Sequence, residues 1–223
     1  MRLIKREPIK MKLALFDFDG TITRKDSFLD FIIYVVGARR FITGLFILSP
    51  FLIAYKLKII SNSKAKEIVL GSFFRGWDAN RFKKAADNYS RDKLPRIVRK
   101  TAMKRLNWHK QEGHKVVIVS ASIDEVLRNW CDMNDVDLIA TKIEVRDGML
   151  TGKFRSKNCY GPEKVSRLKE RFNLTECEYI YAYGDSRGDR EMLALADEAY
   201  HAFSDGLTRT SLNKIHREGT KKT

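Results

Sequence analysis

Cysteine and histidine are scarce in this 223-residue sequence, and neither is spaced like a metal or disulfide framework. The three cysteines, Cys131, Cys159 and Cys177, are odd in number and form no C-x-x-C pair. The four histidines show no metal-ligand spacing either. These absences exclude a disulfide scaffold and a cysteine-rich zinc module, and they are typical of a protein from a reducing compartment.

Long hydrophobic runs, targeting segments and repeats are also missing. The longest uncharged stretch, Phe41–Tyr55, has 15 residues and contains Pro50, whereas a membrane-spanning helix needs about 17–25 residues. We therefore expect no transmembrane span. The basic first ten residues precede no apolar segment with a cleavage site, so we expect no signal peptide. The absence of a repeat period or biased tract excludes collagen-like, low-complexity and coiled-coil proteins.

Acidic residues are outnumbered: 28 Asp and Glu stand against 43 Lys and Arg, which gives a formal charge of +15. This excess favours an anionic partner, either a membrane surface or a soluble ligand, without choosing between them. Its densest part, Arg81–Lys115, has no interleaved series of aromatic residues for stacking on bases, so we expect no nucleic-acid partner. With 43% hydrophobic and 32% charged residues, the chain is globular rather than disordered.

Predicted strands and helices alternate along most of the chain. Apolar runs predict strands at 12–19, 114–120, 136–141 and 178–183. Helical patterns are expected at 95–113, 122–133, 162–172 and 190–195, and a hairpin at 143–154 turns at Asp147-Gly148. This alternation predicts an α/β fold with a three-layer, Rossmann-like parallel sheet.

Residues 23–92 show only helical patterns and no strand signal. We therefore expect an all-helical cap domain at 23–92, inserted between the first and second strands of a core formed by 11–22 and 93–206. The segments 1–10 and 207–223 are assigned to basic termini. Two capping boxes are expected, Ser27 with Asp30 and Ser122 with Glu125, and Pro50 is expected to separate two helical pieces.

Carboxylates collect at the predicted carboxyl ends of two strands. Asp17 and Asp19 end the first strand, and Gly184-Asp185-Ser-Arg-Gly-Asp189 follows the strand at 178–183. Ligands of open α/β sheets bind at this edge. Two carboxylates about 4 Å apart repel each other by roughly 4 kcal/mol at an effective dielectric near 20, so the cluster requires a cation. All-oxygen ligands favour Mg²⁺, which also bridges to a substrate phosphate.

Two further features suit an anionic ligand. The second strand ends at Ser120, and Ala121-Ser122 lead into a helix, whose N-terminal N–H groups bind anions. Lys164 begins the helix that follows Gly161-Pro162 and is a candidate to neutralise a phosphate.

These motifs, in the order Asp17-Phe-Asp-Gly-Thr21, Ser120, Lys164 and Gly184-Asp185-x-x-x-Asp189, resemble those of the haloacid dehalogenase (HAD) superfamily phosphatases. The resemblance covers the core from about residue 11 to 200. The helical cap, the hairpin and the run Asn158-Cys-x-Gly-x-x-Lys164 are similar to the phosphoserine-phosphatase-like subfamily IB.

The resemblance implies a role for each motif. Asp17 would be the nucleophile that forms an aspartyl-phosphate, and Asp19 the general acid and base. Mg²⁺ would be bound by Asp17, Asp185 and the Asp19 carbonyl, with Asp189 as a further catalytic residue that orients Lys164 and the metal's waters. Ser120 and Lys164 would hold the phosphoryl oxygens. The set of substrate contacts comprises Thr21, Asp26, Ser120, Ala121 and Lys164.

The substrate stays open between two classes of phosphomonoester. In phosphoserine phosphatases a glutamate nine residues after the nucleophile contacts the substrate amine, and here that position holds Asp26, which could also cap the helix at 27–36. The alternative substrate is a lipid phosphate, because the apolar segment 41–55 with its basic flanks is similar to that of phosphatidylglycerophosphate phosphatases. This segment is interpreted either as a buried helical hairpin within the cap or as an element at a bilayer interface.

The sequence therefore predicts a Mg²⁺-dependent phosphomonoester hydrolase in the cytoplasm. If the substrate is a lipid phosphate, we also expect the enzyme to contact the anionic inner face of the membrane as a peripheral protein. The alternative to an enzyme is a protein on the same scaffold that binds phosphate or nucleic acid and has no catalytic activity. That hypothesis predicts that catalytic aspartates have been lost. All four are present. Oligomeric state and the choice between hydrolysis and phosphoryl transfer stay open.

Overall fold

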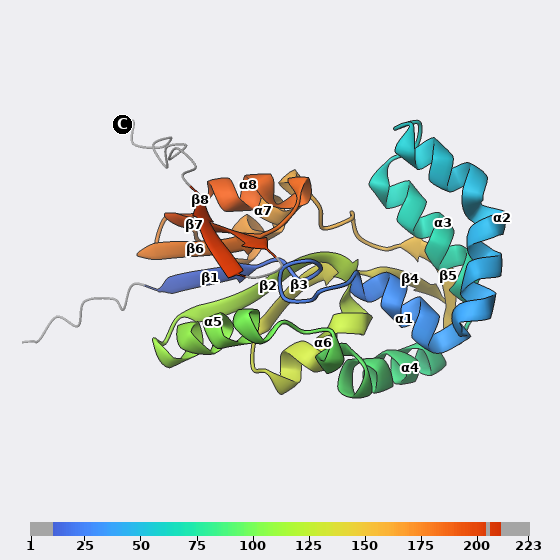
Figure 1. Cartoon of the computed structure of the whole chain (residues 1–223), viewed down its shortest axis with the longest axis horizontal. Coiled ribbons are helices and arrows are strands. Elements are labelled where there is room, and N and C mark those ends of the chain that lie inside the picture. The colour runs from blue at the N-terminus through green and yellow to red at the C-terminus, as the bar shows by residue number, and fades with distance from the viewer. Residues whose placement is uncertain (1–10, 204–205, 211–223) are drawn as a thin grey trace, which may run out of the picture.

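A six-stranded sheet forms the body of the computed structural model, which describes residues 11–203 and 206–210 (Figure 1). Its strand order is β3-β2-β1-β6-β7-β8. The first five strands in this order run parallel, and β8 pairs antiparallel with β7. The strands are β1 Lys12–Phe16, β2 Lys115–Ile123, β3 Asp137–Thr141, β6 Tyr179–Gly184, β7 Glu198–Phe203 and β8 Gly206–Thr210.

Each face of the sheet is covered by helices, as strands that are apolar on both faces require. Leu13 and Leu15 of β1 pack with α7 (Pro162–Arg171) and α8 (Arg190–Ala194) on one face. Ala14 and Phe16 point to the opposite face, toward α5 (Lys100–Gln111) and α6 (Asp124–Met133). The expected three-layer α/β class is confirmed, and Figure 1 shows the two helical layers on either side of the sheet.

Of the five α-helices between β1 and β2, the first four form what we call the helical insertion, and the fifth is α5 of the core. The first four are α1 Ser27–Val36, α2 Ala38–Lys56, α3 Asn62–Phe74 and α4 Ala79–Asp92, and the short 3₁₀ helix η1 (Leu94–Arg96) leads back to the core. The expected insertion of helices between the first two core strands is confirmed. The hairpin β4 (Ile143–Arg146) and β5 (Met149–Phe154) is confirmed as well. Both of its turn residues, Asp147 and Gly148, have positive φ, as a type I′ turn requires.

The hairpin packs against the helical insertion. Gly76 donates its N–H to Leu150, and Leu150 donates to Trp77. Gly152 of β5 approaches Gly71 of α3 so closely that a Cβ atom on Gly152 would lie 2.5 Å from the Gly71 Cα. The insertion and the hairpin therefore form one packed unit beside the sheet.

Both expected capping boxes are wrong. Asp26 caps α1 by accepting the N–H of Leu29, while Asp30 accepts a hydrogen bond from the Tyr89 hydroxyl. The second box fails because β2 continues through Ser122 to Ile123, and α6 has no side-chain cap. Ser27 and Ser122 instead share a hydrogen bond, Oγ to Oγ, at 2.9 Å.

The expected break at Pro50 is also wrong, because α2 runs through it as one helix. Proline removes the N–H that would reach the carbonyl of Phe46 four residues earlier. The hydroxyl of Ser49 donates to that carbonyl at 2.8 Å and satisfies it. The interpretation of 41–55 as a buried hairpin is wrong too, since Phe41 and Leu48 are the buried residues of α2.

The structure also differs from the sequence prediction near the C-terminus of the chain. The sequence assigns 207–223 to a terminal segment, whereas 206–210 form β8, which covers the edge of β7. The remaining terminal residues, 1–10 and 211–223, lie outside the described part of the chain.

Candidate active site

The predicted site residues meet where the sheet order reverses. β1 has β2 on one side and β6 on the other, and these strands are reached by connections on opposite sides, which opens a crevice at their carboxyl ends. Asp17 follows β1 and donates its N–H to the Tyr183 carbonyl at 2.8 Å, which fixes its backbone against β6. Asp185 directly follows β6. Two neighbouring strands thus deliver one carboxylate each to the same crevice.

Lys164 lies between two of the carboxylates. Its Nζ donates to Asp17 Oδ1 and to Asp189 Oδ1, each at 2.6 Å. Only 1% of the Lys164 side chain is exposed, so a lone surface lysine is excluded. Burial opposes its positive charge, but Asp17 and Asp189 outweigh this cost and raise the pKa of the Lys164 ammonium. The lysine therefore stays charged at the centre of the acidic group.

Asp189 is held from its other side by a short turn. Its Oδ2 accepts the Ser186 hydroxyl at 2.8 Å, the Ser186 N–H at 2.9 Å and the Asp185 N–H at 3.2 Å. The Ser186 hydroxyl in turn accepts the N–H of Gly188. These bonds form a capping box at the start of the 3₁₀ helix η2, Arg187–Asp189. With both oxygens occupied, Asp189 is a rigid support for Lys164.

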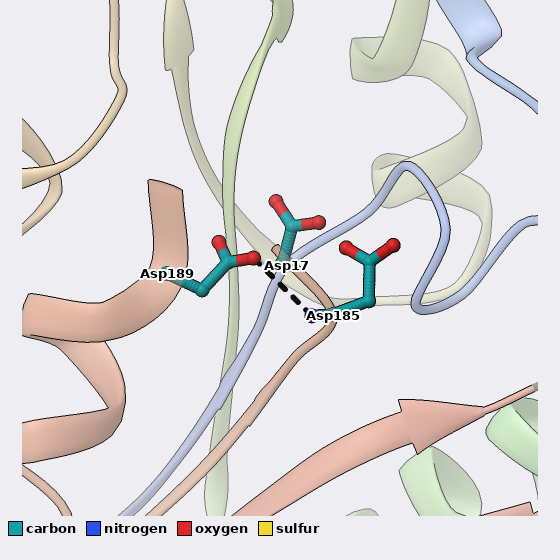
Figure 2. A group of neighbouring side chains, drawn as sticks. All are labelled: Asp17, Asp185 and Asp189. Atoms are coloured by element: carbon teal, nitrogen blue, oxygen red, sulfur yellow. Dashed lines mark hydrogen bonds between the residues drawn. The ribbon is translucent and has the colours of Figure 1, made fainter. Parts of the chain in front are cut away.

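Asp17, Asp185 and Asp189 form a compact carboxylate group (Figure 2). One oxygen from each lies within 4.8 Å of the others. Gly20 makes room for this approach: a Cβ atom there would lie 1.9 Å from Asp185 Oδ2, and its φ of 83° suits glycine. The glycine of the Asp17-Phe-Asp-Gly-Thr21 motif is thus needed for both its shape and its backbone conformation.

The charges of this group fit a divalent cation. When ionised, the three carboxylates carry three negative charges, and the Lys164 ammonium balances only one of them. Two negative charges are therefore left for a cation to balance. Burial raises the pKa of Asp17 to about 8, with the charges of Asp189 and Asp19 adding to it and Lys164 opposing it. Burial and the charge of Asp189 raise the pKa of Asp185 as well. Hard oxygen donors with this excess charge suit Mg²⁺, which would stabilise the ionised forms.

Asp19 faces the helical insertion. Its Oδ1 accepts the N–H of Ser27 at 2.8 Å, at the start of α1. Burial raises the pKa of the Asp19 carboxyl to about 7, and the charge of Asp26 adds to this, while the bond from Ser27 and the charge of Lys66 oppose it. Asp26 itself caps α1 and is exposed. Asp19 therefore titrates near neutrality and lies apart from the three clustered carboxylates.

The remaining predicted residues line the same region. Ser120 is buried, and its hydroxyl accepts the N–H of Ser122 at 3.0 Å. The carbonyl of Ala121 accepts from Thr141 and from Lys66. Thr21 is buried, and its hydroxyl has no hydrogen-bond partner among the residues that the structure describes.

Three residues of the site escaped sequence reasoning. Ser27 and Lys66 come from the helical insertion, and Lys66 Nζ reaches the Ala121 carbonyl at 3.0 Å. Ser186 supports Asp189 from the turn after β6. Lys66 is one of many lysines in a basic chain and has no distinctive spacing, so only its position beside Asp19 and Ala121 distinguishes it. Ser186 could have been found, because it stands three residues before an acid at a helix start.

The insertion is fastened to the core around this crevice. Besides the contacts of Ser27 and Lys66, the amide of Asn158 donates to Asn62 Oδ1 of α3 at 2.9 Å. Within the unit formed by the insertion and the hairpin, the backbone N–H of Phe154 in β5 donates to Glu67 Oε1, also at 2.9 Å. The helices therefore cover one side of the crevice in this structure.

Fold and site together define a Rossmann-like α/β enzyme with a carboxylate and lysine centre at the switch point of its sheet. The chain belongs to the haloacid dehalogenase-like hydrolase family, whose profile matches residues 14–194. The expected membership of the HAD superfamily is confirmed.

Several known proteins resemble this chain. Protein CicA of Caulobacter vibrioides is 36% identical over 188 residues, which is 83% of either chain. A Bordetella pertussis protein of unknown function has a similar structure, with a TM-score of 0.75, 23% identity and coverage of 85% of this chain and 89% of that one. The phospho-aspartyl intermediate analogue structure of a phosphoserine phosphatase matches with a TM-score of 0.60 and 20% identity over 85% of each chain. The last two likenesses show a shared fold.

Proposed function

We propose that this protein is a Mg²⁺-dependent phosphomonoester hydrolase that acts through an aspartyl-phosphate on Asp17. The arrangement of Lys164 between Asp17 and Asp189, with Asp185 beside them, carries the proposal. An ammonium and a divalent cation at one buried point suit a phosphoryl group, whose transfer depends mainly on positioning and on neutralising its oxygens.

In the first step, a carboxylate oxygen of Asp17 forms a bond to phosphorus as the ester oxygen leaves. Asp19 gives that oxygen its proton, so the alcohol departs neutral. In the second step, Asp19 takes a proton from water, and the resulting hydroxide attacks phosphorus and breaks its bond to Asp17. Inorganic phosphate leaves and both carboxyl groups return to their starting state. A pKa of about 7 lets Asp19 serve as acid and as base near neutral pH.

The other residues hold the phosphoryl group and the cation. Ser120 and Lys164 would contact the phosphoryl oxygens, and Asp189 would keep Lys164 in place. Asp17, Asp185 and the carbonyl of Asp19 would hold Mg²⁺, which supplies positive charge to the phosphoryl oxygens when bound. The hydroxyl of Thr21 is buried and has no hydrogen-bond partner in the described part of the chain, which supports its assignment as a substrate contact.

The test compares phosphate release by the wild type and by Asp17→Asn. Asparagine still offers an oxygen to Lys164, so the variant should keep its fold and its melting temperature. We expect the rate to fall by about 10⁴-fold or more, as when other enzymes lose a nucleophile. Asp132→Asn removes an exposed aspartate of α6 and serves as the matched control, with no change expected. A wild-type rate in a folded Asp17→Asn variant would show that Asp17 is not the nucleophile.

Two features of the helical insertion bear on the substrate class, which the sequence leaves open. Asp26 is engaged as the cap of α1, which leaves less of its carboxylate for an amine. The exposed apolar surface of α2 favours a second candidate function, hydrolysis of a lipid phosphate. Phosphate release from micellar phosphatidylglycerophosphate and from free phosphoserine should be compared, with Asp17→Asn as the blank. Preference for the lipid supports this second candidate, and preference for phosphoserine refutes it.

A further inference from the structure

The outer surface of α2 is apolar and open to solvent. Phe46 is 76% exposed, Ile47 72% and Ile53 57%, although each is a large hydrophobic residue. Ile42 and Phe51 add to the same helix, and Leu57 and Ile59 continue the surface into the turn that follows. Figure 1 shows α2 as the outermost helix of the insertion, with α3 between it and the hairpin. We call these seven side chains the α2 surface.

The opposite side of α2 is firmly packed, so the α2 surface cannot turn inward. The ring of Phe41 stacks on that of Phe73 in α3, with centroids 5.9 Å apart. Gly44 lies so close to the Phe73 ring that a Cβ atom there would approach its Cζ to 2.4 Å. Leu48 is buried on the same side. One face of α2 therefore packs on α3, and the apolar residues of its other face, the α2 surface, stay exposed.

The charges around the α2 surface have one sign. No acidic residue occurs between Asp30 and Glu67. Arg39 and Arg40 begin the helix, and Lys56 ends it, followed by Lys58. An uncharged apolar surface with cations at both ends is complementary to a bilayer whose lipid headgroups are anionic.

We propose that α2 docks flat on an anionic lipid bilayer, with the α2 surface inserted among the headgroups and acyl chains. A second copy of this chain is disfavoured as the occupant, because two such helices would bring together basic ends with no acid to pair them. A spanning orientation is disfavoured by the fold. By length and composition α2 could cross a membrane. However, α1 and α3, which precede and follow it, contact each other through the stacked rings of Phe31 and Phe74, so they must lie on the same side of any bilayer.

The docking is independent of catalysis, so flotation with lipid vesicles tests it directly. The full chain is mixed with vesicles of phosphatidylcholine with or without phosphatidylglycerol, at low and at high salt. The test variant is the double substitution Phe46→Ser with Ile47→Ser. Met133→Ser on α6 is the matched control, because it removes another large side chain that is 53% exposed. Melting temperature and hydrolysis of a soluble phosphate ester report whether each variant stays folded.

We expect the wild type to float with phosphatidylglycerol vesicles and to release as salt rises. The double variant should lose about 100-fold in its partition coefficient, since two large apolar side chains no longer leave water. Met133→Ser should bind like the wild type. Arg39→Gln with Arg40→Gln should weaken binding by about fivefold for each charge removed.

Three results would overturn the proposal. The first is a wild type that stays with the buffer at low salt, and the second is a double variant that floats as well as the wild type. The third is a wild type that sediments as a dimer without binding vesicles, together with a monomeric double variant. That third result would make the α2 surface an interface between copies of the chain.

Discussion

Replacing Lys164 with methionine should destabilise the protein strongly, because two buried carboxylates lose their shared counter-charge. Methionine keeps most of the side chain's length and removes only the ammonium. Lys164 Nζ lies 2.6 Å from an oxygen of Asp17 and from one of Asp189. Two unit charges at that distance attract by about 6 kcal/mol at an effective dielectric near 20. Burying all three groups offsets much of this attraction, and breaking such a pair costs about 3–5 kcal/mol net.

The measurement is urea unfolding of the wild type and Lys164→Met in the presence of chelator. Lys169→Met, on the exposed side of the same helix α7, is the matched control and should change the free energy of unfolding by about 0.5 kcal/mol or less. The destabilisation should grow as pH rises through about 8 and above. The folded wild type gives up the Asp17 proton near pH 8, and without Lys164 the pKa of folded Asp17 rises further, so the folded variant retains a proton that the folded wild type has lost.

Asp189→Asn provides a second check through a double-mutant cycle. Because Lys164 and Asp189 contact each other directly, their substitutions should be non-additive by about 1–3 kcal/mol. A folded Lys164→Met variant that loses less than about 1 kcal/mol, with no dependence on pH, would refute the view that Lys164 neutralises the buried carboxylates.

Three other predictions concern the metal, a buried histidine and a close backbone contact. Chelator should stop phosphate release and Mg²⁺ should restore it, and Asp185→Asn should require about tenfold or more Mg²⁺ for half-maximal rate; an unchanged requirement would remove Asp185 from the metal site. Burial lowers the pKa of His109 to about 3. As pH falls below 6.5, this histidine is therefore protonated in the unfolded chain while it stays neutral in the folded chain. The free energy of unfolding should then drop by up to about 1.4 kcal/mol per pH unit, and His109→Gln should flatten that slope in urea titrations. Gly152→Ala should destabilise by about 2–4 kcal/mol because of its clash with Gly71. Gly148→Ala, which meets no neighbour, should cost only about 1 kcal/mol in melting experiments, and equal losses would contradict the close-packing argument.

Local sequence patterns predict where the candidate active-site residues lie. Asp17 and Asp185 stand directly after apolar strands, and parallel strands bring their carboxyl ends to one edge. The turn at Asp147-Gly148 was equally local, since two residues with positive φ define it. Such features depend on a few neighbouring residues and on the sheet geometry, so sequence reasoning reaches them.

Errors arose where a side chain had a choice of partners. Ser27 and Asp30 have the spacing of a capping box, but Ser27 bonds to Ser122 and Asp30 to Tyr89, which come from distant parts of the chain. Pro50 fails to break α2 because the Ser49 hydroxyl satisfies the carbonyl left free. Sequence spacing states which bonds are available, while packing decides which of them form.

The sequence by itself determined the α/β class, the insertion after the first strand and the residues of the acidic crevice, because strand periodicity and short motifs encode them locally. Only the tertiary structure decided the rest. It seated Lys164 between Asp17 and Asp189, brought Lys66 from α3 to the Ala121 carbonyl, and left the α2 surface exposed. The same apolar pattern suits a buried helix and an exposed one, and the difference depends on whether another part of the chain covers it. In this fold α3 covers one side of α2, and no described part of the chain buries Phe46 or Ile47 on the other.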